Sequence, residues 1–256
     1  MPAVTHMDIA PVMSLGLERR EEIAVTERGV AEDRRFFVVD DADRLIDQLL
    51  VADMVQVRAW TDPDATVLRL TFPDGQVFED DVRPGPAFEA MIRRLPTQGH
   101  ELQGPWAEPL SAFMGRSVRV IRTDEPGALQ KDGGLSMVTD ASLDKLSHHL
   151  GTGDIDGRRF RMLVNLSGDV AHEEDTWIGG RIALGETILR VTGAIPRCAI
   201  TTHDPDTGDR DLDTLRAIKE YRGLSGAEGK DLMFGVYGDV ERPGAIRVGD
   251  AVTVLD

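Results

Sequence analysis

Residues 67–78 read VLRLTFPDGQVF, and this stretch shows the pattern on which the fold depends. Leu68, Leu70 and Phe72 alternate with polar residues, which is the two-residue period of a half-buried strand. The turn residues Pro73-Asp74-Gly75 follow, and a second apolar run begins at Val77. The stretch therefore predicts a β-hairpin.

The same strand and turn pattern occurs along the rest of the chain. Phe36–Val39 precedes a polar turn at 40–43 and the apolar pair Leu45-Ile46, which predicts a second hairpin. We predict further strands at 117–121, 163–166, 182–184, 187–191, 234–240 and 245–255. Short strands at this spacing are typical of barrels. We therefore expect a mainly β protein with a few short helices, arranged as two β-rich domains with barrel-like sheets.

A first short helix is predicted from about Pro86, because apolar residues recur at helical spacing up to Leu95 and Pro96 follows. Residues 96–109 contain Pro, Gly and His without periodicity, and we place a long linker or the domain boundary there. The expected domains are 1–100 and 101–256.

Two more helices are predicted from their capping residues. One has Thr139 or Asp140 as N-cap and ends at Gly151, and the other begins at Asp213 and ends at Gly223.

Composition limits the function. The chain has 256 residues, a formal net charge of -16 and one cysteine, which excludes an internal disulfide and an all-cysteine iron–sulfur cluster. The negative charge disfavours binding to nucleic acid or to an anionic membrane, but leaves compact anionic ligands possible. Of the 29 basic residues, 25 are arginine, whose planar donors suit oxyanions. No apolar run reaches the ~18–20 residues of a membrane span and the start MPAVTHMDIA lacks a signal pattern, so we expect a cytoplasmic protein.

Cys198 is the residue most suited to chemistry, and it has three interpretations. It follows an apolar strand and a turn at Gly193, which places it in a loop at a strand end. A lone cysteine is commonly a small buried apolar residue. Alternatively, Arg197 favours a thiolate, which either attacks an electrophile or binds a soft metal.

Two groups of arginines and one Asp-rich segment stand out in the sequence. Arg34-Arg35 and Arg158-Arg159-Phe160-Arg161 are either salt-bridge partners or, if they converge on Cys198, oxyanion-binding forks. The Asp-rich segment 203–213 lacks the spacing of a calcium loop, so we predict a solvated turn before a capped helix. His172 and His203 are candidate bases for the thiol, although no fixed motif ties them to it.

The sequence around Cys198 resembles the signature of the MOSC domain family. The family's motifs occur in order along nearly the whole chain, and upstream segments resemble the N-terminal β-barrel domain of the amidoxime-reducing group. The upstream segments are Thr26-Glu27-Arg28-Gly29, Asp33-Arg34-Arg35-Phe36 and Val38-Val39-Asp40. The MOSC motifs are Arg159-Phe160-Arg161, residues 173–179, Ile182-Ala183-Leu184-Gly185, Pro196-Arg197-Cys198, Thr201-Thr202, Asp204-Pro205, Thr207-Gly208, Phe234-Gly235-Val236-Tyr237 and residues 244–250.

The resemblance implies a molybdenum cofactor held between two β-rich domains, with Cys198 as the protein ligand to molybdenum. It implies that Arg34 and Arg161 contact the anionic or pterin parts of the cofactor. The remaining residues implied to bind the cofactor are Ser14, Thr139, Ser142, Arg197 and Thr201.

Two positions depart from the family pattern. Relatives read Pro-Val-Lys-Ser where this chain has Pro11-Val12-Met13-Ser14, and Arg19 and Arg35 are candidates for a compensating cation. Relatives also have a polar Asn where this chain has Leu163. Loss of a buried charge or amide from an anion site costs ~1–3 kcal/mol.

The resemblance implies a molybdenum-dependent oxidoreductase that reduces small N-hydroxylated compounds, with electrons from separate proteins. Two alternatives remain open. One is a metal-free sulfur-transfer or cysteine-dependent enzyme, which predicts a reactive thiol. The other is a non-catalytic module that binds an anionic ligand without needing Cys198.

Overall fold

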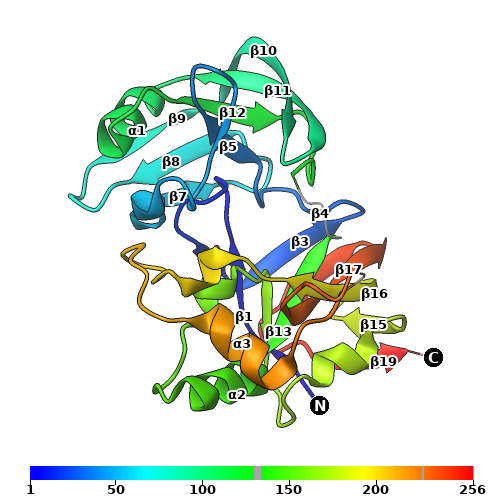
Figure 1. Ribbon diagram of the computed structural model, residues 1–256. Helices are drawn as coiled ribbons and strands as arrows, with labels where there is room; N and C mark the ends of the chain where they lie inside the picture. Colours follow the sequence, from blue (N-terminus) through cyan, green and yellow to red (C-terminus); the bar gives the residue numbers. More distant parts are fainter. Residues whose placement is uncertain (130–133, 227, 256) are drawn as a thin grey trace.

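The computed structural model describes residues 1–129, 134–226 and 228–255, and Figure 1 shows two β-rich regions stacked end to end. The lower region contains an eight-stranded sheet that is antiparallel except between its fifth and sixth strands. In sheet order its strands are β19 (Val252–Leu255), β15 (Arg181–Leu184), β16 (Thr187–Pro196), β17 (Met233–Arg242), β13 (Leu135–Thr139), β14 (Val164–Leu166), β1 (Val4–Ile9) and β2 (Glu18–Arg20).

The upper region contains two sheets. The five-stranded sheet has the order β10 (Arg83–Ile92), β11 (Leu95–Gln103), β12 (Arg119–Thr123), β5 (Phe36–Val39) and β6 (Leu45–Ile46). The other has the order β7 (Arg58–Thr61), β8 (Val67–Thr71) and β9 (Val77–Asp81). A third small sheet, β18 (Gly244–Arg247), β3 (Glu22–Thr26) and β4 (Gly29–Val30), joins the N-terminal segment to the end of the chain.

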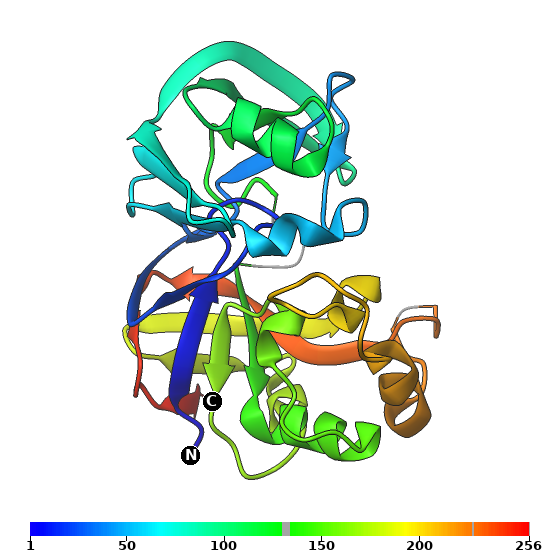
Figure 2. The ribbon, with the colours of Figure 1, turned by 90° about the vertical axis from the view of Figure 1, so that its left-hand side faces the viewer.

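The N-terminal strand belongs to the lower region. β1 pairs with β14, and Val4, Met7 and Ile9 are buried in the core of the eight-stranded sheet. Both chain ends therefore lie in this region, as Figure 2 shows. The segment that leaves β1 runs up to the other region, so residues 10–16 pass between the two bodies.

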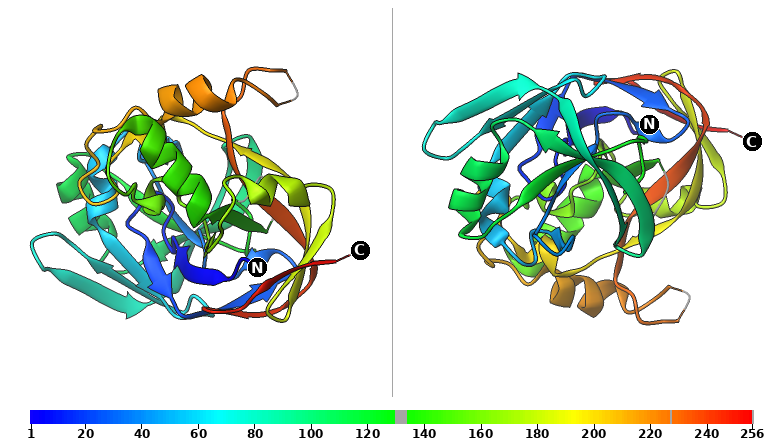
Figure 3. Two further views of the ribbon diagram at one scale, coloured as in Figure 1. Left: turned by 90° about the horizontal axis from the view of Figure 1, so that it is seen from below. Right: turned by 90° about the horizontal axis from the view of Figure 1, so that it is seen from above.

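Two of the three predicted α-helices are confirmed by their capping residues. Thr139 caps α2 (Asp140–Leu150), which ends at Gly151, and Asp213 caps α3 (Thr214–Arg222). The two helices pack together, with α2 at the end of the lower region that faces away from the upper one and α3 on the side of that region (Figures 1 and 3). Among the described residues, no helix is long and apolar enough to span a membrane.

Both hairpins predicted from turn residues are also confirmed, because β5 pairs with β6 and β8 pairs with β9. The predicted helix over 86–95 is wrong. These residues form β10, the turn at Arg93 and Arg94, and the start of β11. Phe88 and Ile92 face the core, whereas Met91 is 65% exposed, so the apolar residues follow a strand period rather than a helical one.

Segment 96–109, expected to hold a linker or the domain boundary, contains most of β11 and the beginning of α1 (Ala107–Met114). Four 3₁₀ helices complete the described elements: η1 (Ala52–Gln56), η2 (Gly157–Phe160), η3 (Glu173–Trp177) and η4 (Ala199–Thr202). Two of these, η2 and η4, position the residues of the main cavity.

Candidate functional site

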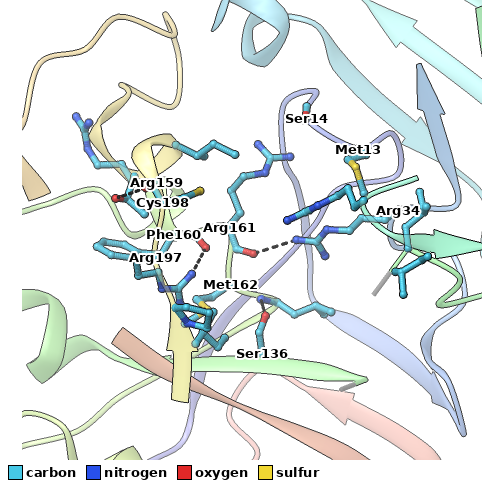
Figure 4. Close-up of a pocket in the computed structure, with 18 of the residues that line it drawn as sticks. Met13, Ser14, Arg34, Ser136, Arg159, Phe160, Arg161, Met162, Arg197 and Cys198 are labelled. Carbon is cyan, nitrogen blue, oxygen red and sulfur yellow. Dashed lines mark hydrogen bonds between the residues drawn. The ribbon is translucent and has the colours of Figure 1, made fainter. Parts of the chain in front are cut away.

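A cavity of about 520 Å³ lies between the two regions, a size typical of small-molecule sites. The upper wall comes from the segment after β1, Arg34 two residues before β5, and the β10–β11 turn. The lower wall comes from β13, the segment between η2 and β14, and the segment between β16 and η4. The residues of the two walls used below are Met13, Ser14, Arg34, Arg93, Arg94, Leu129, Ser136, Arg159, Phe160, Arg161, Met162, Arg197, Cys198 and Thr201 (Figure 4).

The cavity lining is cationic. Six arginines line it, and no Asp or Glu is found among the described residues that do so. The whole chain has a formal net charge of -16, so the sign of the charge is locally reversed. A cleft lined by one sign of charge concentrates ligands of the opposite sign. The arrangement therefore favours a small anionic ligand.

Left-handed backbone conformations gather at the same place. Of the eight described non-glycine residues with positive φ, five line the cavity, namely Ser14, Arg34, Arg93, Arg94 and Arg161. Such conformations are unfavourable for residues with a Cβ and are concentrated at functional sites. The backbone is thus held in these conformations at the cavity by the surrounding structure.

Arg34 and Arg161 meet across the cavity. One guanidinium nitrogen of Arg34 donates to Asp33, and the other donates to the backbone carbonyl of Arg161 at 3.3 Å. The Arg161 guanidinium donates to the carbonyl of Leu15 at 2.8 Å. Burial, with a further contribution from the charge of Arg34, lowers the pKa of Arg161 to about 9. A bound anion would relieve this repulsion between like charges.

Cys198 lies on the lower wall, in the loop between β16 and η4. Its side chain is exposed, and its carbonyl accepts hydrogen bonds from the backbone N–H of Thr201 at 3.2 Å and from the Thr201 hydroxyl at 3.1 Å. The Thr201 hydroxyl is 2.7 Å from that of Thr214 at the start of α3. Of the three interpretations of this cysteine, the buried apolar residue is therefore wrong.

Arg197 holds this loop in place. Its guanidinium donates to the carbonyl of Phe234 at 2.8 and 2.6 Å and to the carbonyl of Phe160 at 3.0 Å. The same group lies over the Phe160 ring, 5.4 Å from the ring centroid. Arg197 therefore fixes the end of β16 against η2 and β17.

The segment that follows η4 is held by an ion pair between a buried arginine and an exposed aspartate. Arg159, whose side chain is 5% exposed, makes a bidentate contact with Asp211, with two N–O distances of 2.6 Å. Arg158 makes a similar contact with Asp206, at 2.8 and 2.7 Å, on the exposed side. Two of the aspartates in segment 203–213 thus pair with arginines of η2.

The predicted site residues divide into two groups. The structure brings Ser14, Arg34, Arg161, Arg197, Cys198 and Thr201 to one cavity. Thr139 and Ser142 are not among its lining residues, because they are fully buried at the start of α2. Their hydroxyls donate to the carboxylate of Glu174 at 2.8 and 2.7 Å, and burial raises the pKa of this carboxyl. The geometry gives these two hydroxyls a structural role.

The histidines proposed as bases for Cys198 do not line the cavity either. His172 stacks on Tyr221 with ring centroids 5.7 Å apart, and burial lowers its pKa to about 4. His203 is buried, which also lowers its pKa.

The sequence analysis missed three polar residues that line the cavity, Ser136, Arg93 and Arg94. Ser136 lies on β13, where its hydroxyl accepts from the backbone N–H of Leu163 at 3.0 Å. Arg93 and Arg94 were not recognised as site residues because their segment was predicted to be a helix. Phe88, Ala90 and Ile92 recur at the two-residue spacing of a strand, and this is the signal that could have predicted a strand leading to them.

Met13 is 4% exposed and packs in an apolar cluster with Phe37, Phe88, Ile92 and Leu129. The two cations considered as substitutes for a lysine at this position are engaged elsewhere. Arg19 pairs with Asp8 at 3.1 Å, and Arg35 donates to the carbonyl of Asp124 at 3.0 Å. Neither lines the cavity.

Two family models together match most of the chain. The model for the MOSC domain matches residues 124–253, and that for the MOSC N-terminal beta barrel domain matches residues 1–116. The chain is 26% identical to mitochondrial amidoxime-reducing component 1 of Mus musculus, over 98% of this chain and 82% of that protein. It is 39% identical to mitochondrial amidoxime reducing component 2 of Homo sapiens, over 46% of this chain and 36% of that protein. Among solved structures, the YuaD protein from Bacillus subtilis aligns with 14% identity and a TM-score of 0.45, over 98% of this chain and 94% of that one.

Proposed function

The chain belongs to the MOSC domain family, and from this membership and the chemistry of the cavity we propose that it is a molybdenum-cofactor-dependent oxidoreductase acting on N-hydroxylated compounds. The relatives named amidoxime-reducing components support the reaction class, because amidoximes are N-hydroxylated. The observation that carries the proposal is the exposed thiol of Cys198 in the same cavity as Arg34 and Arg161, with no Asp or Glu among the described residues that line it.

The residues of the cavity fit this cofactor. A thiolate is a soft ligand that suits molybdenum, and arginine forks suit a phosphate. The hydroxyl of Ser14 is 6% exposed at residue level and has no hydrogen-bond partner in the described parts of the chain, so it is available to a polar ligand. When bound, the cofactor would supply a metal that changes oxidation state and accepts an oxygen atom.

The protein's own residues would position these parts. Cys198 would present its sulfur from a loop that Arg197 and Thr201 hold rigid. Arg34 and Arg161 would neutralise the anionic part and, through their bonds across the cavity, keep the two walls at a fixed separation. Because these groups are fixed before the ligand binds, little conformational entropy is lost on binding.

The overall reaction consumes two electrons and two protons. The N–O bond of the substrate breaks, its hydroxyl leaves as water with one of the protons, and the nitrogen takes up the other proton. A separate electron-donor protein would supply the electrons, because the single cysteine of this chain cannot hold an iron–sulfur cluster of four thiolates.

The test is molybdenum content together with the fluorescence of oxidised pterin, on protein from a host that makes the cofactor. Wild type should carry molybdenum and pterin in near-stoichiometric amounts. Cys198→Ala should lose the metal while its Tm stays unchanged. Reduction of an amidoxime by wild type and its loss in Cys198→Ser would complete the assignment. A different result would contradict the proposal: wild type carries neither metal nor pterin, and Cys198 is rapidly alkylated or carries a persulfide. The protein would then be a metal-free sulfur-transfer or cysteine-dependent enzyme.

A further inference from the structure

The turn between β10 and β11 places two arginines on the rim of the cavity. β10 and β11 pair up to Ile92 and Leu95, so Arg93 and Arg94 form a two-residue connection. Both residues are exposed, and their φ angles are +50° and +69°. A two-residue hairpin turn with both φ angles positive is the type I′ pattern.

Arginine is a poor choice for such a turn. The type I′ turn strongly prefers Asn-Gly or Gly-Gly, because a Cβ is unfavourable at positive φ. The Arg93-Arg94 pair therefore lowers the stability of the hairpin relative to the usual turn residues. Unfavourable backbone conformations that persist at a cavity indicate a functional requirement.

The other arginines of the cavity are engaged with the protein. Arg159 binds Asp211, and Arg34 donates to Asp33 and to the carbonyl of Arg161. By contrast, the side chains of Arg93 and Arg94 make no hydrogen bond or ion pair within residues 1–129, 134–226 and 228–255. Their five N–H donors each are available to a ligand.

The turn is also fixed relative to the cavity. Ile92, directly before it, is 1% exposed and packs with Met13 and Leu129, which line the same cavity. Figure 4 shows Met13 and Cys198 on opposite sides of Arg161, so the turn belongs to the wall that faces the thiol. An anionic group held there would leave the rest of a ligand extending towards Cys198.

We propose that Arg93 and Arg94 form an oxyanion-binding site on the rim, which takes a phosphate or carboxylate group of a small molecule occupying the cavity. The proposal rests on the proposed function only in taking this cavity as the ligand site. The anionic group has two possible sources, the phosphate of the cofactor or an acidic group on the substrate. Planar guanidinium forks bind both.

The first experiment titrates full-length protein, made in a host without the pterin cofactor, with inorganic phosphate by calorimetry. Arg93→Gln/Arg94→Gln should raise the Kd at least about tenfold, as expected for the loss of charge-assisted hydrogen bonds. The control Arg116→Gln/Lys219→Gln removes two exposed charges away from the cavity and should leave the Kd at the wild-type value. Equal Kd values in the two double variants would overturn the proposal.

A second variant separates binding from folding. Arg93→Asn/Arg94→Gly gives the turn its preferred residues and should raise the Tm by about 2–4 °C while weakening phosphate binding as the glutamine pair does. A lower Tm would show that the arginines serve the hairpin itself and would count against a ligand-binding role.

Cofactor-loaded protein then identifies the source of the anion. If the glutamine pair loses pterin relative to its control, the site takes the cofactor phosphate. If pterin content is unchanged and KM rises only for an N-hydroxylated substrate that carries a carboxylate, the site takes the substrate. Absence of metal and pterin from wild type would contradict the proposed function but leave the phosphate titration as a valid test of the rim.

Discussion

The side chain of Arg34 bonds to the backbone carbonyl of Arg161, and the side chain of Arg161 bonds to the carbonyl of Leu15, so the two arginines tie opposite walls of the cavity together. Both residues have a left-handed backbone, with φ angles of +51° and +50°. Two adjacent guanidinium groups repel each other, and this repulsion is what a bound anion would remove. The same contacts that join the two regions therefore prepare the cavity for a negatively charged ligand.

Arg161→Gln tests this arrangement. The variant should lose most of its pterin when made in a cofactor-producing host, because one of the two guanidinium groups that face the anion is gone. Its Tm without ligand should change little, because removal of the repulsion offsets the lost hydrogen bond to Leu15. Pterin content and thermal unfolding are the two measurements. Full pterin content in the variant would contradict the role given to Arg161.

The ion pair between Arg159 and Asp211 should matter for the loop that carries Cys198. Asp211→Asn leaves the buried guanidinium with only Asp204, 3.6 Å away, as an acidic partner. We expect a loss of ~1–3 kcal/mol in the free energy of unfolding. The matched control is Asp206→Asn, which removes the partner of the more exposed Arg158 and should cost less than ~1 kcal/mol. Denaturant titrations compare the two variants, and equal losses would show that burial of the Arg159 guanidinium gives its ion pair no special role.

Gly235 lets β17 pass close beneath the cavity. Its φ is +71°, and a Cβ there would clash with the Met162 side chain and lie 2.7 Å from the carbonyl of Met137. We expect Gly235→Ala to cost ~2–4 kcal/mol, from overpacking and from the unfavourable φ together. Gly249 has a φ of +91° with nothing within 4 Å of the added Cβ, so Gly249→Ala isolates the backbone cost and should lose only ~1 kcal/mol. If both variants lose the same amount, the close packing at Gly235 is unimportant.

His172 should make the protein sensitive to acid. Burial, helped by the charge of Arg222, lowers its pKa from 6.5 to about 4. Between these two values the unfolded chain binds a proton that the folded protein does not, so the contribution is fully present above pH 6.5 and is lost as the pH falls towards 4. His172→Asn keeps a residue that tolerates the observed φ of +64° and removes the titration.

The free energies of unfolding of wild type and His172→Asn should therefore converge as the pH falls from 7 to 4. The control His148→Asn replaces an exposed histidine of α2 by the same residue and is measured over the same range. A constant difference for His172→Asn would contradict the assigned protonation state.

Local sequence signals predicted those parts of the fold that depend on turn and capping chemistry. Pro73-Asp74-Gly75 and Thr139 each satisfy a specific backbone requirement, so their hairpin and helix were predictable. The β10–β11 hairpin was not, because Arg93-Arg94 lacks the residues that normally mark its turn. The approach of Cys198, Arg34 and Arg161 was expected only from a family resemblance. It depends on β1 joining a sheet formed by the second half of the chain, a long-range pairing that periodicity does not encode.

Met13 and the Arg93-Arg94 turn lie in the same wall of the cavity, so a cation at position 13 should be able to replace the turn arginines in binding an anion. Met13 lines the cavity and packs against Ile92, so a lysine there can lay its stem along the apolar cluster and extend its ammonium into the cavity. We expect Met13→Lys, added to Arg93→Gln/Arg94→Gln, to recover about tenfold in phosphate affinity, the effect of one new charge-assisted hydrogen bond. Met91→Lys in the same background adds a charge to an exposed position on β10 outside the cavity and should recover little. Calorimetry with inorganic phosphate measures both. Equal recovery in the two variants would mean that only net charge matters. Recovery specific to position 13 would show that a cation at this position can replace the rim arginines in binding phosphate.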